Sequence, residues 1–136
     1  MILEIDEITT IGELQRHFSA SFPFLKLAVC KNVSMINDAN KCIEIKDSDT
    51  LINTLRTKHR EVFLEIHYWQ KTGTIEKLFL HKAALHVQLL RKQGEHWIET
   101  SGTDELTLEE QNDIGRKATQ ELLHGMRRPV ELEKPI

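Results

Sequence analysis

The side chains of this 136-residue chain that could do chemistry are seven histidines, the glutamates near them and two cysteines. The pattern Thr-Ile-x-x-Leu-x-x-His occurs twice, ending at His17 and at His81. Histidine acts as a general base or a metal ligand only where a partner lies within hydrogen-bond reach, and the sequence indicates no partner for either residue. We therefore interpret both histidines as boundary residues beside the apolar stripe of a helix, repeated because the architecture repeats.

The known catalytic and metal-binding motifs do not occur. His81 and His86 are five residues apart, which is not the same-face spacing of a helical metal pair, and there is no HExxH, glycine-rich phosphate loop or GxSxG. We predict no catalytic residue, no metal and no cofactor. One alternative remains, a small cytoplasmic enzyme or small-ligand sensor with a His/Glu site between the repeats, built from His67, His96 and neighbouring glutamates.

The two cysteines, Cys30 and Cys42, could face each other across a hairpin that closes around residue 36. Free cysteine behaves as a small hydrophobe, so we expect two reduced thiols in contact, with a redox role as the lesser alternative. Two cysteines without a CxxC motif also fit a reducing cytoplasm.

The elements that must position these residues follow one order twice: strand, helix, strand, strand, helix. In the first half they are expected at 1–5, 10–22, 25–31, 41–45 and 47–59, and in the second at 62–69, 74–85, 86–92, 96–100 and from 107. We predict an α+β fold: a single domain, 1–125, made of two βαββα repeats (about 1–60 and 61–125) packed pseudo-symmetrically. Because a βαβ step makes parallel strands and a tight turn makes antiparallel ones, the β-sheet should be mixed.

The end of the chain is predicted to be a long helix followed by a tail. Thr107 and Glu110 have the spacing of a capping box, and the helix is expected to end at Gly125, with 126–136 as a flexible tail. Gly115, inside this helix, indicates a close approach of another part of the chain.

Composition excludes several classes of partner. The net charge is −3, from 18 basic and 21 acidic residues that are mixed along the chain, so nucleic acid is not an expected partner. No stretch approaches the ~20 apolar residues of a membrane span, and the acidic start MILEIDE is unlike a secretory signal. We expect a soluble, cytoplasmic protein.

Alternation along the expected strands divides their residues between a helix-facing side and an opposite side that carries both tryptophans. Aromatic anchors with a polar rim are typical of protein interfaces, although tryptophans are also common core residues. The best functional hypothesis is a non-enzymatic protein-interaction module that binds either a second copy of itself or another protein. Its surface would contain Glu65, His67, Trp69, Leu90, Trp97 and Glu99.

The run RKQGEHWIETSGTDELTLEEQN, residues 91–112, combines a tryptophan-containing hairpin, a Thr-Asp turn and a capped helix. It resembles a segment of small uncharacterised bacterial proteins. The resemblance implies a bacterial source and no known activity, ligand or site residue.

Overall fold

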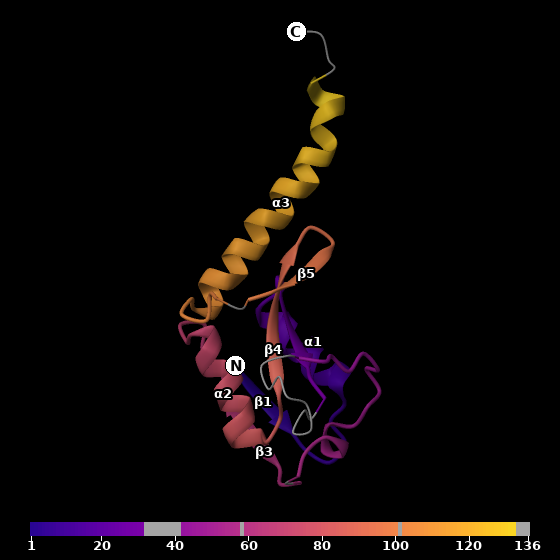
Figure 1. Cartoon of the computed structure of the whole chain (residues 1–136), viewed down its shortest axis with the longest axis vertical. Coiled ribbons are helices and arrows are strands. Elements are labelled where there is room, and N and C mark those ends of the chain that lie inside the picture. Colours follow the sequence, from indigo (N-terminus) through magenta and orange to yellow (C-terminus); the bar gives the residue numbers. More distant parts are fainter. Residues whose placement is uncertain (32–41, 58, 101, 133–136) are drawn as a thin grey trace.

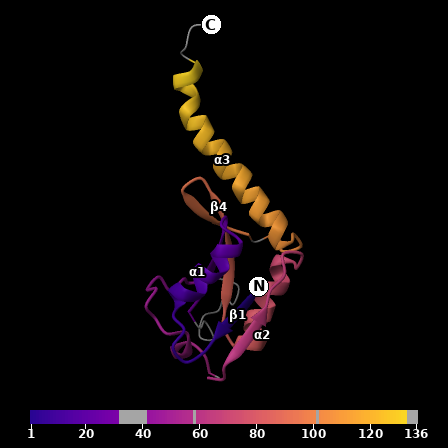
Figure 2. The ribbon, with the colours of Figure 1, turned by 180° about the vertical axis from the view of Figure 1, so that it is seen from behind.

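The computed structural model describes residues 1–31, 42–57, 59–100 and 102–132, with side chains as far as His124. Within them, three α-helices and two antiparallel sheets form an α+β fold. Figures 1 and 2 show a body of strands flanked by α1 and α2, from which α3 projects. The elements are β1 (Ile2–Ile5), α1 (Ile11–Ser21), β2 (Leu25–Val29), the 3-10 helix η1 (Ile52–Thr54), β3 (Val62–Glu65), α2 (Thr72–Ala83), β4 (Val87–Gln93), β5 (His96–Glu99) and α3 (Leu108–Leu132).

The strands pair between the halves of the chain. β1 pairs with β3 in a two-stranded sheet, and the second sheet has the order β2-β4-β5. All of these pairs are antiparallel, so the expected mixed sheet is wrong. The parallel pairing would have required α1 to connect neighbouring strands of one sheet, whereas α1 leads from β1 in one sheet to β2 in the other.

One apolar core lies between the sheets and the first two helices. α1 packs on β1 and β2, and α2 packs on β3 and β4. Apolar residues at helical spacing face inward from both helices, and alternate residues face inward from the strands. These buried residues include Ile11, Leu14 and Phe18 of α1, Ile75, Phe79 and Ala83 of α2, and Leu3, Ile5, Leu25, Leu27, Leu64, Ile66 and Leu89.

The first turns of α1 and α2 make matching contacts. The amide of Gly12 donates to Ser48 (2.9 Å) and that of Gly73 donates to Asp104 (3.0 Å). A Cβ atom on Gly12 would lie 3.0 Å from Ser48 Cβ, and one on Gly73 would lie 3.2 Å from Asp104 Cβ. A side chain at either position would push the contacting segment, at Ser48 or at Asp104, away from the helix. Glycine at both positions therefore permits this close approach.

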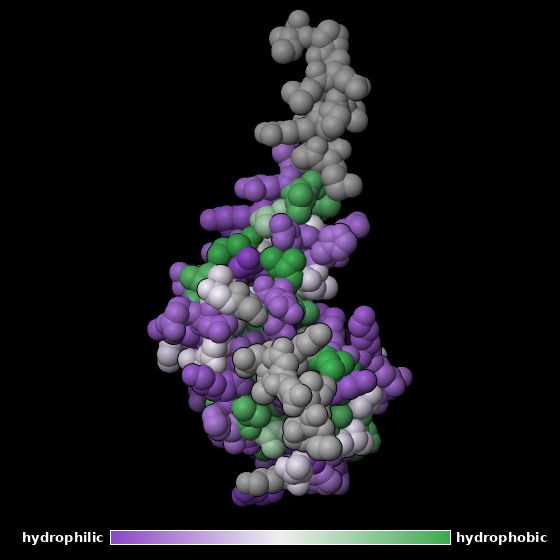
Figure 3. Space-filling model, viewed as in Figure 1, coloured by the Kyte–Doolittle hydropathy of each residue, from purple (hydrophilic) through white to green (hydrophobic). Residues whose placement is uncertain are grey.

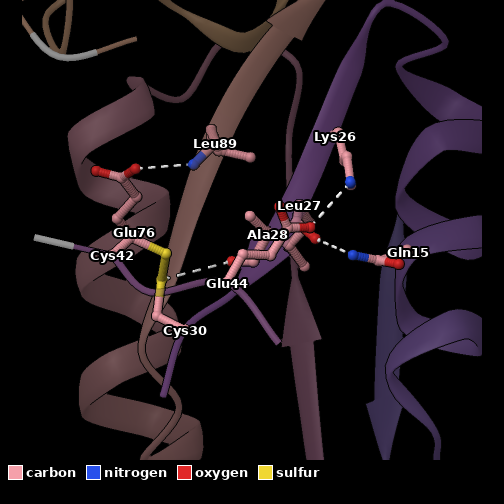
Figure 4. Close-up of a disulfide and its surroundings, with 9 residues drawn as sticks. All are labelled: Gln15, Lys26, Leu27, Ala28, Cys30, Cys42, Glu44, Glu76 and Leu89. Atoms are coloured by element: carbon pink, nitrogen blue, oxygen red, sulfur yellow. Dashed lines mark hydrogen bonds and ion pairs between the residues drawn. A yellow bond between two sulfur atoms is a disulfide. The ribbon is translucent and has the colours of Figure 1, made fainter. Parts of the chain in front are cut away.

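Both helices also reach a strand through the side chain one turn later. Gln15 donates from Nε2 to the Leu27 carbonyl (2.9 Å), and Glu76 accepts at Oε2 from the Leu89 amide (2.9 Å). Figure 4 shows the two contacts on either side of β2 and β4. Leu27 and Leu89 are themselves partners in the β2–β4 ladder, so the two contacts are related across this strand pair.

Glu76 is a partly buried acid with a pKa above its usual value of 4.5, chiefly because burial disfavours its charged form, and the charge of Asp104 adds to the rise. The folded state therefore binds this proton more tightly than the unfolded state does, and ionisation lowers stability as the pH rises above 4.5. We expect Glu76→Gln to raise the free energy of unfolding at pH 7 and to have little effect at pH 3.5.

Urea unfolding at a series of pH values measures this effect. Gln15→Glu is the reciprocal variant, and we expect it to lower stability most at neutral pH, because a carboxylate cannot donate to the Leu27 carbonyl. A Glu76→Gln protein that is less stable than wild type at pH 7 would contradict the dominance of burial.

Three expected elements differ in the structure. The segment 41–45 forms no named strand, although Glu44 makes an isolated bridge to Cys30. In place of a helix over 47–59, the described residues contain only the short η1. α3 does not end at Gly125 but continues to Leu132, while the flexibility of the chain after it stays a prediction.

The second hairpin and the start of α3 agree with the sequence. β4 and β5 are joined at Gly94, which has a positive φ of 67°. Thr107 and Glu110 form both hydrogen bonds of a capping box, at 3.1 and 3.0 Å. A Cβ atom on Gly115 would lie 3.0 Å from Phe24 and from Arg91 Cγ, which confirms the close approach of β2 and β4 to α3.

Cys30 and Cys42 form a disulfide, with their Cα atoms 5.2 Å apart (Figure 4). The expected proximity is confirmed and the expected pair of reduced thiols is wrong. Cys30 bridges Glu44 rather than lying directly opposite Cys42, and its side chain is buried.

The disulfide removes the cysteine argument for a reducing cytoplasm, because disulfides persist mainly in oxidising compartments. The cytoplasmic location stays a prediction. Across the described residues, none of the helices has the length and apolar character required to cross a membrane.

Candidate functional site

The structure divides the predicted interaction residues between the two sheets. Glu65 ends β3, and His67 and Trp69 follow it in the loop before α2. Leu90, Trp97 and Glu99 lie instead on β4 and β5. The sequence had indicated one shared sheet face for these six residues. They do not share one, because β3 and the β4–β5 hairpin belong to different sheets.

The first group belongs to the outer face of the β1–β3 ribbon. Leu3, Ile5, Leu64 and Ile66 point into the core, and the residues between them point outward. We call this outward surface the ribbon face; it consists of Ile2, Glu4, Phe63, Glu65, His67 and Trp69.

Direct contacts connect one side of the ribbon face. His67 Nε2 lies 3.2 Å from Glu65 Oε1, and the His67 ring stacks on Trp69 with ring centroids 5.2 Å apart and planes inclined by 10°. Trp69 is nevertheless 59% exposed and Phe63 is 53% exposed. The ribbon face therefore presents two large aromatic side chains and Ile2 to solvent, with Glu65 and His67 between the two aromatic residues.

The second group is more enclosed by its neighbours. Leu90 lies opposite Glu99 on one side and Lys26 on the other, and Lys26 forms an ion pair with Glu44 at 2.9 Å. Lys92 Nζ lies 5.9 Å from the ring centroid of Trp97, which is 37% exposed. A cation over an aromatic ring is a favourable contact, so Trp97 already has a partner within the chain.

The histidines do not converge on a chemical site. His67 has Glu65 beside it, whereas His96 and Glu99 lie at opposite ends of β5. His17 and His81 are both exposed, and they are not at matching positions, since the helices begin after Thr10 and Lys71. Among the described residues, no group of three or more histidine, cysteine, aspartate or glutamate side chains could hold a metal ion.

Phe63 and one cavity were not expected from the sequence. Phe63 lies two residues before Glu65 on β3 and therefore on the same side of the strand, so strand periodicity was a sufficient signal for placing it on the ribbon face. The cavity lies beside Phe63, between the start of β3 and the end of α2, and its basic lining comes partly from Arg56 and Arg60. These two residues had been expected within and just after a helix, where no signal connected them with α2.

On the face of the molecule shown in Figure 3, hydrophilic side chains separate the apolar surface into several patches, one of them along α3. Among the α3 side chains that the structure describes, which end at His124, the exposed large apolar ones are Ile114, Leu122 and Leu123.

Comparison of the chain with known proteins identified no relative. No family model, curated protein or solved structure matches the chain. The resemblance of residues 91–112 to a bacterial family, and the bacterial source that it implies, stay predictions.

Proposed function

We propose that this protein is a non-enzymatic protein-interaction module that binds through its ribbon face. The observation that carries the proposal is the exposure of Phe63 and Trp69 on one small antiparallel sheet whose other face packs on the core. Large aromatic residues dominate the binding energy of protein interfaces, and polar groups at the rim set orientation. Glu65 and His67 supply such polar groups beside Trp69.

The occupant that we propose is a second copy of the chain. A twofold dimer places the same surface on both partners, so the surface must be complementary to itself, with apolar groups and with polar groups that can bond to one another. The ribbon face contains the polar side chains of Glu4, Glu65 and His67, along with Ile2, Phe63 and Trp69. Leu90, Trp97 and Glu99, the other residues of the single surface predicted from the sequence, form the alternative interface.

The experiment is a measurement of solution mass by size-exclusion chromatography with light scattering over a range of concentrations. We expect a wild-type dimer, and we expect Trp69→Glu to weaken it by about thirtyfold or more, the effect of losing one interface hot spot. Trp97→Glu makes the same chemical change on the other sheet and should leave the dimer intact. Circular dichroism verifies that both variants fold.

Two results would reject parts of this proposal. A wild-type protein that is monomeric at all concentrations would exclude the second copy as the occupant. A dimer that dissociates with Trp97→Glu but not with Trp69→Glu would transfer the interface to the β4–β5 surface.

We also infer that the two halves are repeats of one ancestral unit. The matched pairs Leu3 and Leu64, Gly12 and Gly73, and Phe18 and Phe79 all have the same separation in sequence. The contacts of Gly12 with Ser48 and of Gly73 with Asp104 support this inference. With this matching, the counterpart of His17 is Leu78, so the repeated histidine of the sequence motif is a coincidence of spacing.

A further inference from the structure

One cavity in the described part of the chain has a volume of about 630 Å³. It lies where the C-terminal end of α2 meets the start of β3, at the lower end of the body in Figure 1. This volume is within the range of small-molecule sites, ~300–1,000 Å³. Two parts of the chain line the cavity. Arg56, Arg60 and Glu61 lie before β3 and are followed by Val62 and Phe63 of β3, and residues 80–84 form the end of α2 and its cap.

Basic groups predominate in this lining. Arg56, Arg60 and Lys82 carry positive charges, His81 is a fourth basic side chain, and Glu61 is the one acid among the lining residues. This balance is the opposite of that of the whole chain, which has a net charge of −3. His81 and Lys82 also suit the negative end of the α2 dipole, but Arg56 and Arg60 belong to another segment and have no such explanation.

The acid of the cavity lies beside a second acid. Interaction with the Glu61 side chain is the main reason why the pKa of Glu4 is raised. Among the described residues, the recorded ion pairs involve neither Arg60 nor Lys82. Arg56 is 4% exposed and its side chain donates to the Arg60 carbonyl, so this hydrogen bond holds the two arginines beside each other at the cavity.

The cavity also has an apolar wall. Phe63 is 53% exposed and Leu80 is 51% exposed, and both line the cavity with Ala83 and Ala84. Large apolar side chains that remain half-exposed around a concave surface are typical of ligand sites, because the ligand covers them.

We propose that this cavity binds a small organic anion, with its charged group against Arg56, Arg60 and Lys82 and its aromatic or aliphatic body against Phe63 and Leu80. A carboxylate, sulfonate or phosphate on an apolar body satisfies both parts of the lining. The cavity shares Phe63 with the ribbon face, but Arg56, Arg60, Leu80 and Lys82 lie outside that face, so variants at Trp69 and at Arg60 and Lys82 test the two proposals independently.

The test uses two fluorescent probes that share one aromatic body. 8-Anilinonaphthalene-1-sulfonate carries a sulfonate, and N-phenyl-1-naphthylamine is its neutral analogue. We expect saturable binding of the sulfonate at one site per chain, about tenfold tighter than binding of the neutral probe, because hydrogen bonds to an ionised group are the stronger ones. Added inorganic phosphate at constant ionic strength should compete.

Variants then locate the site. The double variant Arg60→Gln/Lys82→Gln should lose this advantage of the sulfonate while retaining the weak binding of the neutral probe. Lys77→Gln removes a positive charge from an exposed position on the same helix, outside the cavity lining, and should bind like wild type. Urea unfolding of each variant verifies that the fold is retained.

The proposal is overturned if the sulfonate shows no saturable binding to the folded wild type, or if the double variant binds it as tightly as wild type does. Equal affinity for the two probes would also overturn it, because the basic groups would then contribute nothing.

Discussion

Phe79→Ala is expected to lower the free energy of unfolding by about 3–5 kcal/mol, the largest effect of any single substitution considered for this chain. Phe79 is fully buried in α2, and truncation removes its apolar contacts and leaves a cavity between α2 and the strands. A domain of this size has a stability of roughly 5–15 kcal/mol, so the variant should be close to its unfolding threshold. Urea unfolding followed by circular dichroism measures the loss.

The matched control is Leu80→Ala, the next residue on the same helix. Leu80 is 51% exposed, so its truncation removes little buried area, and we expect a loss below about 1 kcal/mol. Phe18 occupies the corresponding position of α1 and is also fully buried, so Phe18→Ala should cost as much as Phe79→Ala. Similar small losses for Phe79→Ala and Leu80→Ala would contradict the packing of α2.

Reduction of the Cys30–Cys42 disulfide is expected to lower the free energy of unfolding by about 3 kcal/mol. The two cysteines are 12 residues apart, and a crosslink over such a loop restricts the unfolded chain by about this amount of free energy. Parallel urea unfolding of the protein with and without a phosphine reductant measures the difference.

A thiol titration gives the second part of this test. The unreduced protein should show no reactive thiol in denaturant, and the reduced protein should show two. The double variant Cys30→Ser/Cys42→Ser should be about as stable as the reduced protein and insensitive to reductant. Two titratable thiols in denatured protein that has never been reduced would show that the disulfide is absent in solution.

Local features of the fold were predictable because they depend on residues close in sequence. The capping box at Thr107, the turn at Gly94 and the inward alternation of Leu3, Ile5, Leu64 and Ile66 follow from spacing alone. The close approach at Gly115 could also be inferred, since glycine inside a helix is costly without a packing reason.

The pairing of strands was not predictable by the same means. A strand–helix–strand order is compatible with parallel neighbours, yet β1 pairs with β3 and β2 with β4. Periodicity shows which side of a strand is apolar, but the core can bury that side against several possible neighbours. The sequence therefore placed Trp69 and Trp97 on one surface, while the division into two sheets separates them.

The candidate sites show the same division of information. The sequence by itself determined an α+β chain with one apolar core, no known catalytic motif, and exposed aromatic candidates that include Trp69. Only the tertiary structure decided that Phe63 and Trp69 share the ribbon face, that Cys30 and Cys42 are joined, and that Arg56 and Arg60 meet the end of α2. The physical reason is that these relationships join residues from different elements. Their proximity follows from how the whole core packs, which no local spacing specifies.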